Sequence, residues 1–236
     1  MVIRPIVAAL LVAASVSCSA VLPVRYEYDE DTYLVLDGSA ILYVNASVAA
    51  LAALRGAPLN VDPRGRLDRN DVRAFFESQV THVESISTSR REGRRYVHVR
   101  IRTNDIRRLS DAPAFAWSRY SLTQEEGLAV FRQDVGPSVR HERPNVGWTG
   151  KELVAFRLHL PSRVAYHNGP SREIERGNII RWEQLLTDRL AGRPVSIEVR
   201  METQSILVQT LTLFALTAIA ALGAMALAVW WVMHRK

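Results

Sequence analysis

The fold is decided by the stretch Arg94–Thr103, which reads RRYVHVRIRT. Its apolar residues Val97, Val99 and Ile101 occupy every second position, and polar or basic side chains lie between them. Successive side chains of a strand point to opposite faces of a sheet, so this alternation predicts a β-strand with one buried face. Sheets that keep one polar face are typically antiparallel.

The same alternation appears on both sides of this stretch. It recurs in ELVAFRLHLP (residues 152–161) and PVSIEVRME (residues 194–202), and the opening run VRYEYDEDTYLVLDGSAILYVN (residues 24–45) is also strand-like. The turn residues Gln124–Gly127 separate two further strand-like runs, which predicts a hairpin.

Short helices interrupt the strands. Asn45 or Ser47 is a suitable N-cap for SVAALAALRG (residues 47–56), and Gly56 closes that helix. A second helix is predicted in DRNDVRAFFES (residues 68–78), and shorter helical turns over residues 104–110 and 185–192. We therefore predict an α+β domain, built mainly of antiparallel β-sheet with a few short helices.

The C-terminal run predicts one transmembrane helix. From Ile206 to Met233 there is no charged residue, and about 20 apolar residues suffice to cross the hydrocarbon core. Trp230 and Trp231 lie where an interfacial aromatic belt belongs, and the basic tail 234–236 follows. The alternative is a buried core helix, but a charge-free run of this length is rare in soluble domains.

Residues 1–18 read as a secretory signal: Arg4 precedes an apolar run that is too short to span a bilayer. Two interpretations stay open. Either the signal is cut near Ala20 and Cys18 is discarded, or Ser15–Cys18 is a lipobox and Cys18 is the lipidation site of a bacterial lipoprotein. Cys18 is the only cysteine, so no disulfide forms within one chain.

These two ends fix the expected topology. The positive-inside rule places residues 234–236 in the cytoplasm and residues 19–205 outside, as an extracytoplasmic domain on the bacterial plasma membrane. Acylation of Cys18 would then bring both ends of this domain to the same leaflet. Only residues 203–205 separate the last strand from the membrane helix, so the domain is expected close to the bilayer.

Charge does not indicate a nucleic-acid partner, although the sequence pI is 9.9. Removing Arg4, Arg235 and Lys236 from the 30 basic residues leaves 27 basic against 24 acidic residues, so the extracytoplasmic part has a net charge of only +3. Nearly all basic residues are arginine, which more simply reflects codon composition than a phosphate-binding surface.

No pattern for catalysis or metal binding is present. The run VDPRGRLDRNDVRAFF (residues 61–76) resembles a calcium loop, but Arg64, Arg66 and Arg73 occupy positions that require oxygen ligands. The histidines have no ligand spacing, and no G-x-S-x-G motif occurs. We expect a protein that is not an enzyme and has no cofactor and no metal.

Four arginines surround Glu92–Gly93 in TSRREGRRYVH (residues 88–98), namely Arg90, Arg91, Arg94 and Arg95. The simpler interpretation is a solvated hairpin tip in an arginine-rich chain. The sharper one is a tip that contacts lipid headgroups beside the membrane.

The C-terminal part resembles a known family. The segments VAFRLHLPSRVAYHNG (residues 154–169), GNIIRWEQ (177–184) and VSIEVRMETQSIL (195–207), followed by one transmembrane helix, resemble the LppM-like domain of bacterial envelope lipoproteins. The shared features are Pro161, the Asn168–Gly169 turn, Trp182 and a closing strand that ends at Glu202. Ser15 and the longer two-helix insert before Val80 depart from the pattern.

The resemblance implies a β-rich domain with an apolar cavity that binds envelope lipids or glycolipids, and it carries over no catalytic residue. Six aromatic residues are candidates for lining or supporting that cavity: Phe75, Phe76, Phe115, Trp117, Phe156 and Trp182. Core packing is the simpler interpretation of each. The alternative function is a structural or assembly module that docks other envelope proteins, which predicts a filled core and an exposed apolar patch.

Overall fold

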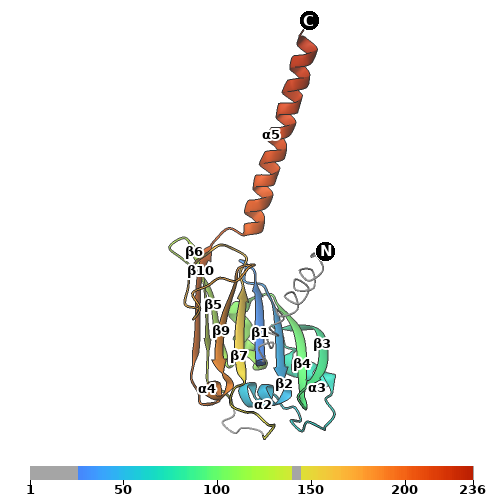
Figure 1. The fold of residues 1–236 in the computed structure, drawn as a ribbon, viewed down its shortest axis with the longest axis vertical. Helices are drawn as coiled ribbons and strands as arrows, with labels where there is room; N and C mark the ends of the chain where they lie inside the picture. Colours follow the sequence, from blue (N-terminus) through green and yellow to red (C-terminus); the bar gives the residue numbers. More distant parts are fainter. Residues whose placement is uncertain (1–25, 140–144, 236) are drawn as a thin grey trace, which may run out of the picture.

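The alternating stretch forms strand β4 (Arg94–Thr103) in the computed structural model, which describes residues 26–139 and 145–235 (Figure 1). Val97, Val99 and Ile101 are buried, as predicted. β4 belongs to a six-stranded sheet with the spatial order β3–β4–β2–β1–β7–β9. Its other strands are β3 (His82–Arg91), β2 (Ala40–Ser47), β1 (Tyr26–Leu34), β7 (Leu153–His159) and β9 (Ile179–Leu185).

A second sheet has four strands in the order β5–β6–β10–β8. They are β5 (Ser118–Glu125), β6 (Leu128–Val135), β10 (Val195–Glu202) and β8 (Val164–His167). β5 and β6 form the predicted hairpin, and its two turn residues, Glu126 and Gly127, both have positive φ, as a tight hairpin turn requires. All neighbouring strands pair antiparallel except β1 and β7, which are parallel. The predicted α+β class with mainly antiparallel sheets is confirmed.

The hydrophobic core lies between the two sheets. Tyr28 of β1 and Phe156 of β7 contribute from the six-stranded sheet, and Phe131 of β6 and Val199 of β10 contribute from the four-stranded sheet. The buried residues form one contiguous cluster, so the described part of the chain outside α5 folds around a single core.

Short helices close the gaps around this core. α2 (Val48–Arg55) starts where predicted: Ser47 Oγ accepts a hydrogen bond from Ala50 N, and Gly56 ends the helix in the left-handed region with φ 69°. α3 (Arg69–Phe76) is capped by Asp68, and α4 (Leu186–Leu190) follows β9 directly. The 3₁₀ turns η1 (Ile106–Asp111) and η2 (Pro113–Phe115) connect β4 to β5.

α5 (Ile206–His234) projects away from the two sheets (Figure 1). Ser205 caps its first turn, the mean hydropathy of its most apolar window is 2.2, and none of that window is buried against the rest of the described chain. A core helix would be covered by protein. The helix is therefore an exposed apolar rod, long enough to cross a bilayer as a single anchor.

The sheets have two distinct ends. Ile206 N donates to Pro161 O at 3.0 Å, just beyond the end of β7, so α5 leaves the domain at what we call the anchor end. Tyr26 pairs with Leu153 at the opposite end, which we call the far end. In Figure 1 the short helices α2 and α4 also lie at the far end.

Candidate functional site

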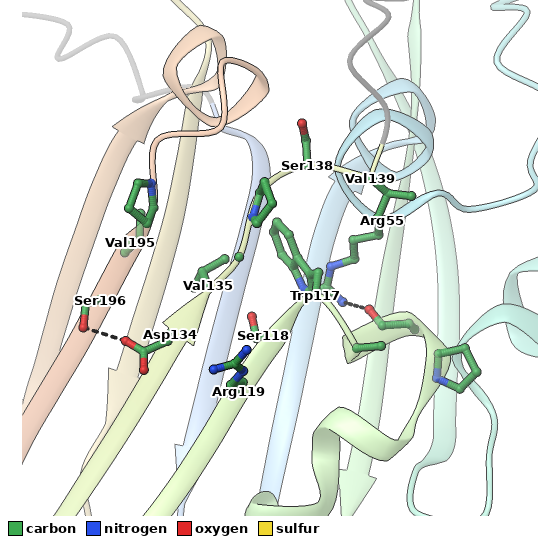
Figure 2. Close-up of a pocket in the computed structure, with 16 residues that line it drawn as sticks. Arg55, Trp117, Ser118, Arg119, Asp134, Val135, Ser138, Val139, Val195 and Ser196 are labelled. Atoms are coloured by element: carbon green, nitrogen blue, oxygen red, sulfur yellow. Dashed lines mark hydrogen bonds between the residues drawn. The ribbon is translucent and has the colours of Figure 1, made fainter.

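A pocket of about 570 Å³ opens at the far end of the two sheets. The beginning of β5, the end of β6 and the beginning of β10 meet there, because Ser118 pairs with Val135 and Val135 pairs with Val195. Figure 2 shows Trp117 in the middle of this pocket, between the Arg55 side chain and Val135. The pocket volume falls within the range of roughly 300–1,000 Å³ that small-molecule sites occupy.

One wall of the pocket is the segment 136–139, which two backbone hydrogen bonds fix in place. Gly136 N donates to Trp117 O at 2.7 Å, and Val139 N donates to Leu54 O at 3.1 Å. A Cβ atom at position 136 would lie 2.7 Å from that same Trp117 oxygen. Only glycine therefore allows this close approach between the wall and Trp117.

Most of the pocket lining is apolar. The lining residues without a polar side chain are Pro113, Ala114, Ala116, Val135, Gly136, Pro137, Val139, Pro194 and Val195. Prolines and small side chains leave the space open, and Val139 is itself exposed. The lining suits an apolar group that enters from the far end.

A polar network lies beneath this apolar surface. The Arg55 guanidinium donates one hydrogen bond to Ala114 O at 2.9 Å and another to the carboxyl group of Glu30. Tyr28 Oη donates to the same carboxyl group at 2.7 Å, and Gln133 Nε2 donates to it at 3.3 Å. Side chains from both sheets and from α2 thus meet in the core.

Trp117 contacts two arginines at once. The Arg55 guanidinium lies 4.8 Å and the Arg189 guanidinium 5.4 Å from the centre of the indole ring. Arg55 also lies 4.7 Å from the rings of Tyr28 and Phe115, so three aromatic rings surround it. Such cation–π contacts stabilise a buried cation by roughly 0.5–2 kcal/mol each.

Burial sets the ionisation of these groups. It raises the pKa of Glu30 to about 8 and lowers the pKa of Arg55 to about 9, because both lie fully inside the protein. Burial also lowers the pKa of Arg189 to about 10. Both guanidinium groups therefore stay charged at neutral pH.

The six aromatic candidates do not gather around one pocket. Trp117 lines the pocket and packs against Phe156, with ring centres 6.1 Å apart. Phe76 contacts Phe115 and Phe75 on the α3 side of the core. Trp182 is buried on β9, and its indole N–H donates to Asn168.

The four candidate headgroup arginines lie at the predicted hairpin tip, between β3 and β4. The tip is at the far end, since Arg91 donates to Tyr26 O at 2.8 Å. Arg94 and Arg95 are buried: Arg94 pairs with Glu27 at 3.1 Å, and Arg95 donates to the backbone oxygens of Asn60 and Gly65. The tip thus lies at the end of the sheet opposite to α5, and its contact with lipid headgroups stays a prediction.

Cys18 and the predicted signal, residues 1–18, lie outside the described residues. Tyr26 marks where the described domain begins, at the far end. Whether both ends of the domain meet one leaflet stays a prediction.

Sequence reasoning missed the buried charged residues. Arg55 directly precedes the glycine that ends a helix, where an exposed arginine is expected. Arg189 lies in a short helical turn, and the local sequence likewise predicts that it is exposed. Glu30 gave a usable signal, because strand periodicity places it on the same face as Tyr28 and Leu34, which are buried. Over residues 26–139 and 145–235, no cluster of metal-ligating side chains is found.

The fold can be compared with those of known proteins. No family model matches the chain, and no curated protein matches it. The fold is similar to that of LppM. The NMR structure of the folded domain of Mycobacterium tuberculosis LppM superimposes with a TM-score of 0.40 and 12% sequence identity, over 76% of this chain and 91% of that domain. At this identity the likeness to LppM concerns the fold alone.

Proposed function

We propose that this protein is an anchored, non-catalytic domain that binds the apolar part of an envelope lipid or glycolipid in the far-end pocket. α5 holds the domain on the bacterial plasma membrane, and the pocket faces away from it. The pocket carries the proposal, because it combines an apolar lining with space for part of a lipid and with buried polar groups beneath.

The position of the pocket determines where a bound lipid lies relative to the membrane. Strand β10 runs from the pocket at Val195 to the anchor end at Glu202, about 25 Å at the usual rise per residue. The bound lipid is therefore held away from the bilayer that contains α5, as in a domain that receives or presents a lipid above the membrane.

Docking of partner proteins is supported less well. A docking surface needs a contiguous apolar patch. In the described domain before α5, the exposed large apolar residues come from the end of β1 and from four other segments of the chain: Tyr33, Val35, Val139, Tyr166, Ile174 and Leu185.

Lipid occupancy tests the proposal. The full chain is purified from its own envelope in a mild detergent, and bound lipid is detected by native mass spectrometry. Ala116 is exposed and lines the pocket, so Ala116→Trp fills the pocket with little change to the core. Ala165 is exposed on β8, outside the pocket, so Ala165→Trp is the matched control.

We expect the wild type and Ala165→Trp to carry the same lipid, and Ala116→Trp to lose most of it. Equal occupancy in all three proteins would place the lipid elsewhere, and absence of lipid from the wild type, also after adding total envelope lipid, would contradict the proposal.

A further inference from the structure

Basic side chains concentrate at one corner of the far end, where the segment 62–69 lies beside the β3–β4 turn, residues 90–95. These two segments contain seven arginines and three acidic residues, which is a net charge of +4. Residues 19–205 as a whole have a net charge of only +3, so the remainder of that range has a net charge of −1. The positive charge of the domain is therefore concentrated at this corner.

A groove of about 370 Å³ lies between the two segments. Its lining residues are Gly65, Arg66 and Leu67 of the first segment, Thr88, Ser89 and Arg90 of β3, and Arg95 of β4. Arg95 joins the two sides, because its guanidinium donates to the backbone oxygen of Gly65 at 2.9 Å and to that of Asn60. The groove shares no lining residue with the far-end pocket.

The charges of the groove repel one another. Arg90 and Arg95 lie directly opposite each other on β3 and β4, and like charges in such a pair destabilise a sheet. Arg66 and Arg90 are exposed, and no carboxylate of the described residues lies within ion-pair distance of either side chain or of Arg95. Burial and the neighbouring Arg90 lower the pKa of Arg95, against the opposing effect of Asp62. A bound anion would offset this repulsion.

The lining also indicates the class of anion. Guanidinium groups pair with phosphate, sulfate and carboxylate oxygens, and the exposed Thr88 adds a hydroxyl group. Leu67 is the only large apolar residue of the lining, whereas a protein partner requires an apolar centre. None of the lining residues is aromatic, so the bases of a single-stranded nucleic acid have no ring on which to stack. This lining fits a sugar polymer that carries anionic groups.

We infer that the groove is a binding site for a linear anionic polysaccharide, whose phosphate, sulfate or carboxylate groups pair with Arg66, Arg90 and Arg95. The charges of such a polymer repeat along its length, so one chain contacts the arginines of both segments at once. The groove lies at the end of the sheet opposite to α5, so the polymer reaches it from the side that faces away from the anchor. The inference goes beyond lipid binding and does not depend on it.

Dextran sulfate is the probe for this site, and uncharged dextran of the same length is its control. The full chain is placed in nanodiscs of uncharged phosphatidylcholine, so that α5 remains in a bilayer, and fluorescently labelled polymer is titrated. We expect dextran sulfate to bind and uncharged dextran not to bind. Because salt screens exposed charges, the affinity should fall when the salt concentration rises from about 50 to about 200 mM.

Two double variants with the same loss of charge locate the site. Arg66→Gln with Arg90→Gln removes two exposed cations of the groove, and we expect the affinity to fall by about tenfold. Arg172→Gln with Arg176→Gln removes two exposed cations from the loop between β8 and β9, and its affinity should match the wild type. In urea the groove variant should be at least as stable as the wild type, because it removes the repulsion between Arg90 and Arg95.

Three results would contradict the inference. The first is a wild type that does not bind dextran sulfate. The second is an equal affinity of the two double variants, which would mean that net charge alone attracts the polymer. The third is tighter binding of polyglutamate or of anionic lipid vesicles through Arg66 and Arg90, which would assign the groove to an acidic protein or to a lipid surface.

The test also separates this site from the lipid pocket. Ala116→Trp fills the far-end pocket and leaves the groove unchanged, so we expect this variant to bind dextran sulfate like the wild type. Loss of polymer binding in Ala116→Trp would contradict a separate groove site. Binding of dextran sulfate by a wild type that carries no lipid would support the groove and contradict the lipid function alone.

Discussion

Tyr26 and Ile206 lie at opposite ends of the six-stranded sheet. Tyr26 pairs with Leu153 at the start of β7, whereas Ile206 donates to Pro161 O just beyond the end of β7. The chain therefore enters the described domain at the far end and leaves it at the anchor end. Because the pocket shares the end with Tyr26, the anchor and the site are separated by the length of the strands.

This separation predicts the distance of the pocket from the membrane. In a Cys18→Ser background, single fluorescent labels are placed at Ala116→Cys in the pocket and Gln204→Cys beside α5. In proteoliposomes with quencher-labelled lipid headgroups, the label at 204 should be strongly quenched, and the label at 116, about 25 Å further out, should not. Equal quenching would mean that the domain lies on its side.

The anchor prediction concerns the middle of α5. Ile219→Arg places a charge near the bilayer centre, at a cost of about 2.5–3.5 kcal/mol on insertion scales. We expect a clear loss of the protein from the carbonate-resistant membrane fraction. Ile219→Leu should stay fully membrane-bound, and retention of Ile219→Arg at the same level would argue against a spanning helix.

Two of the aromatic residues should differ sharply in their effect on stability. Phe156 is 3% exposed and contacts Tyr28 and Trp117, whereas Phe75 only borders the core. We expect Phe156→Ala to lower the free energy of unfolding by about 3–5 kcal/mol and Phe75→Ala by clearly less. Urea denaturation of the full chain in detergent measures both, and similar losses would contradict the assigned core.

The buried carboxyl group of Glu30 predicts a pH dependence of stability. Its pKa is about 8 in the folded protein against 4.5 in the unfolded chain, so the folded state binds more protons between these values. The free energy of unfolding should therefore fall as the pH rises through this window. Burial and the neighbouring Asp31 raise the pKa of Asp29 to about 6. Asp29 therefore also makes the free energy of unfolding fall with rising pH, in the lower part of this pH window.

Glu30→Gln isolates this effect. Glutamine does not ionise, so the difference in stability between about pH 5 and pH 8 should be smaller in Glu30→Gln than in the wild type. Asp29→Asn should reduce the dependence only in the lower part of the window. Parallel stability curves for Glu30→Gln and the wild type would show that Glu30 does not titrate as described.

Local patterns predicted most of the fold. The alternation in Arg94–Thr103 became β4, the serine and glycine around residues 48–55 delimit α2, and the charge-free run from Ile206 became α5. Each of these signals resides in neighbouring residues. The parallel pairing of β1 with β7 was not predictable, because it joins residues more than a hundred positions apart.

The pocket was harder to predict than the fold, for the same reason. Trp117 was singled out among the aromatic residues, but Arg55 and Arg189 read as ordinary solvated helix ends. Their burial depends on α2 and α4 meeting the start of β5, which no local pattern encodes. The position of the β3–β4 hairpin was visible in the sequence, whereas its direction relative to α5 was not, because that direction depends on how distant strands pair.

The most direct test of the central claim is to locate a bound lipid on the chain. Envelope lipid carrying a photoreactive group on its acyl chain is added to the full chain in nanodiscs, and cross-linked peptides are identified by mass spectrometry. A lipid held in the pocket labels residues 113–119, 135–139 and 194–196, and Ala116→Trp abolishes this labelling. Labelling confined to α5 would contradict lipid binding by the far-end pocket.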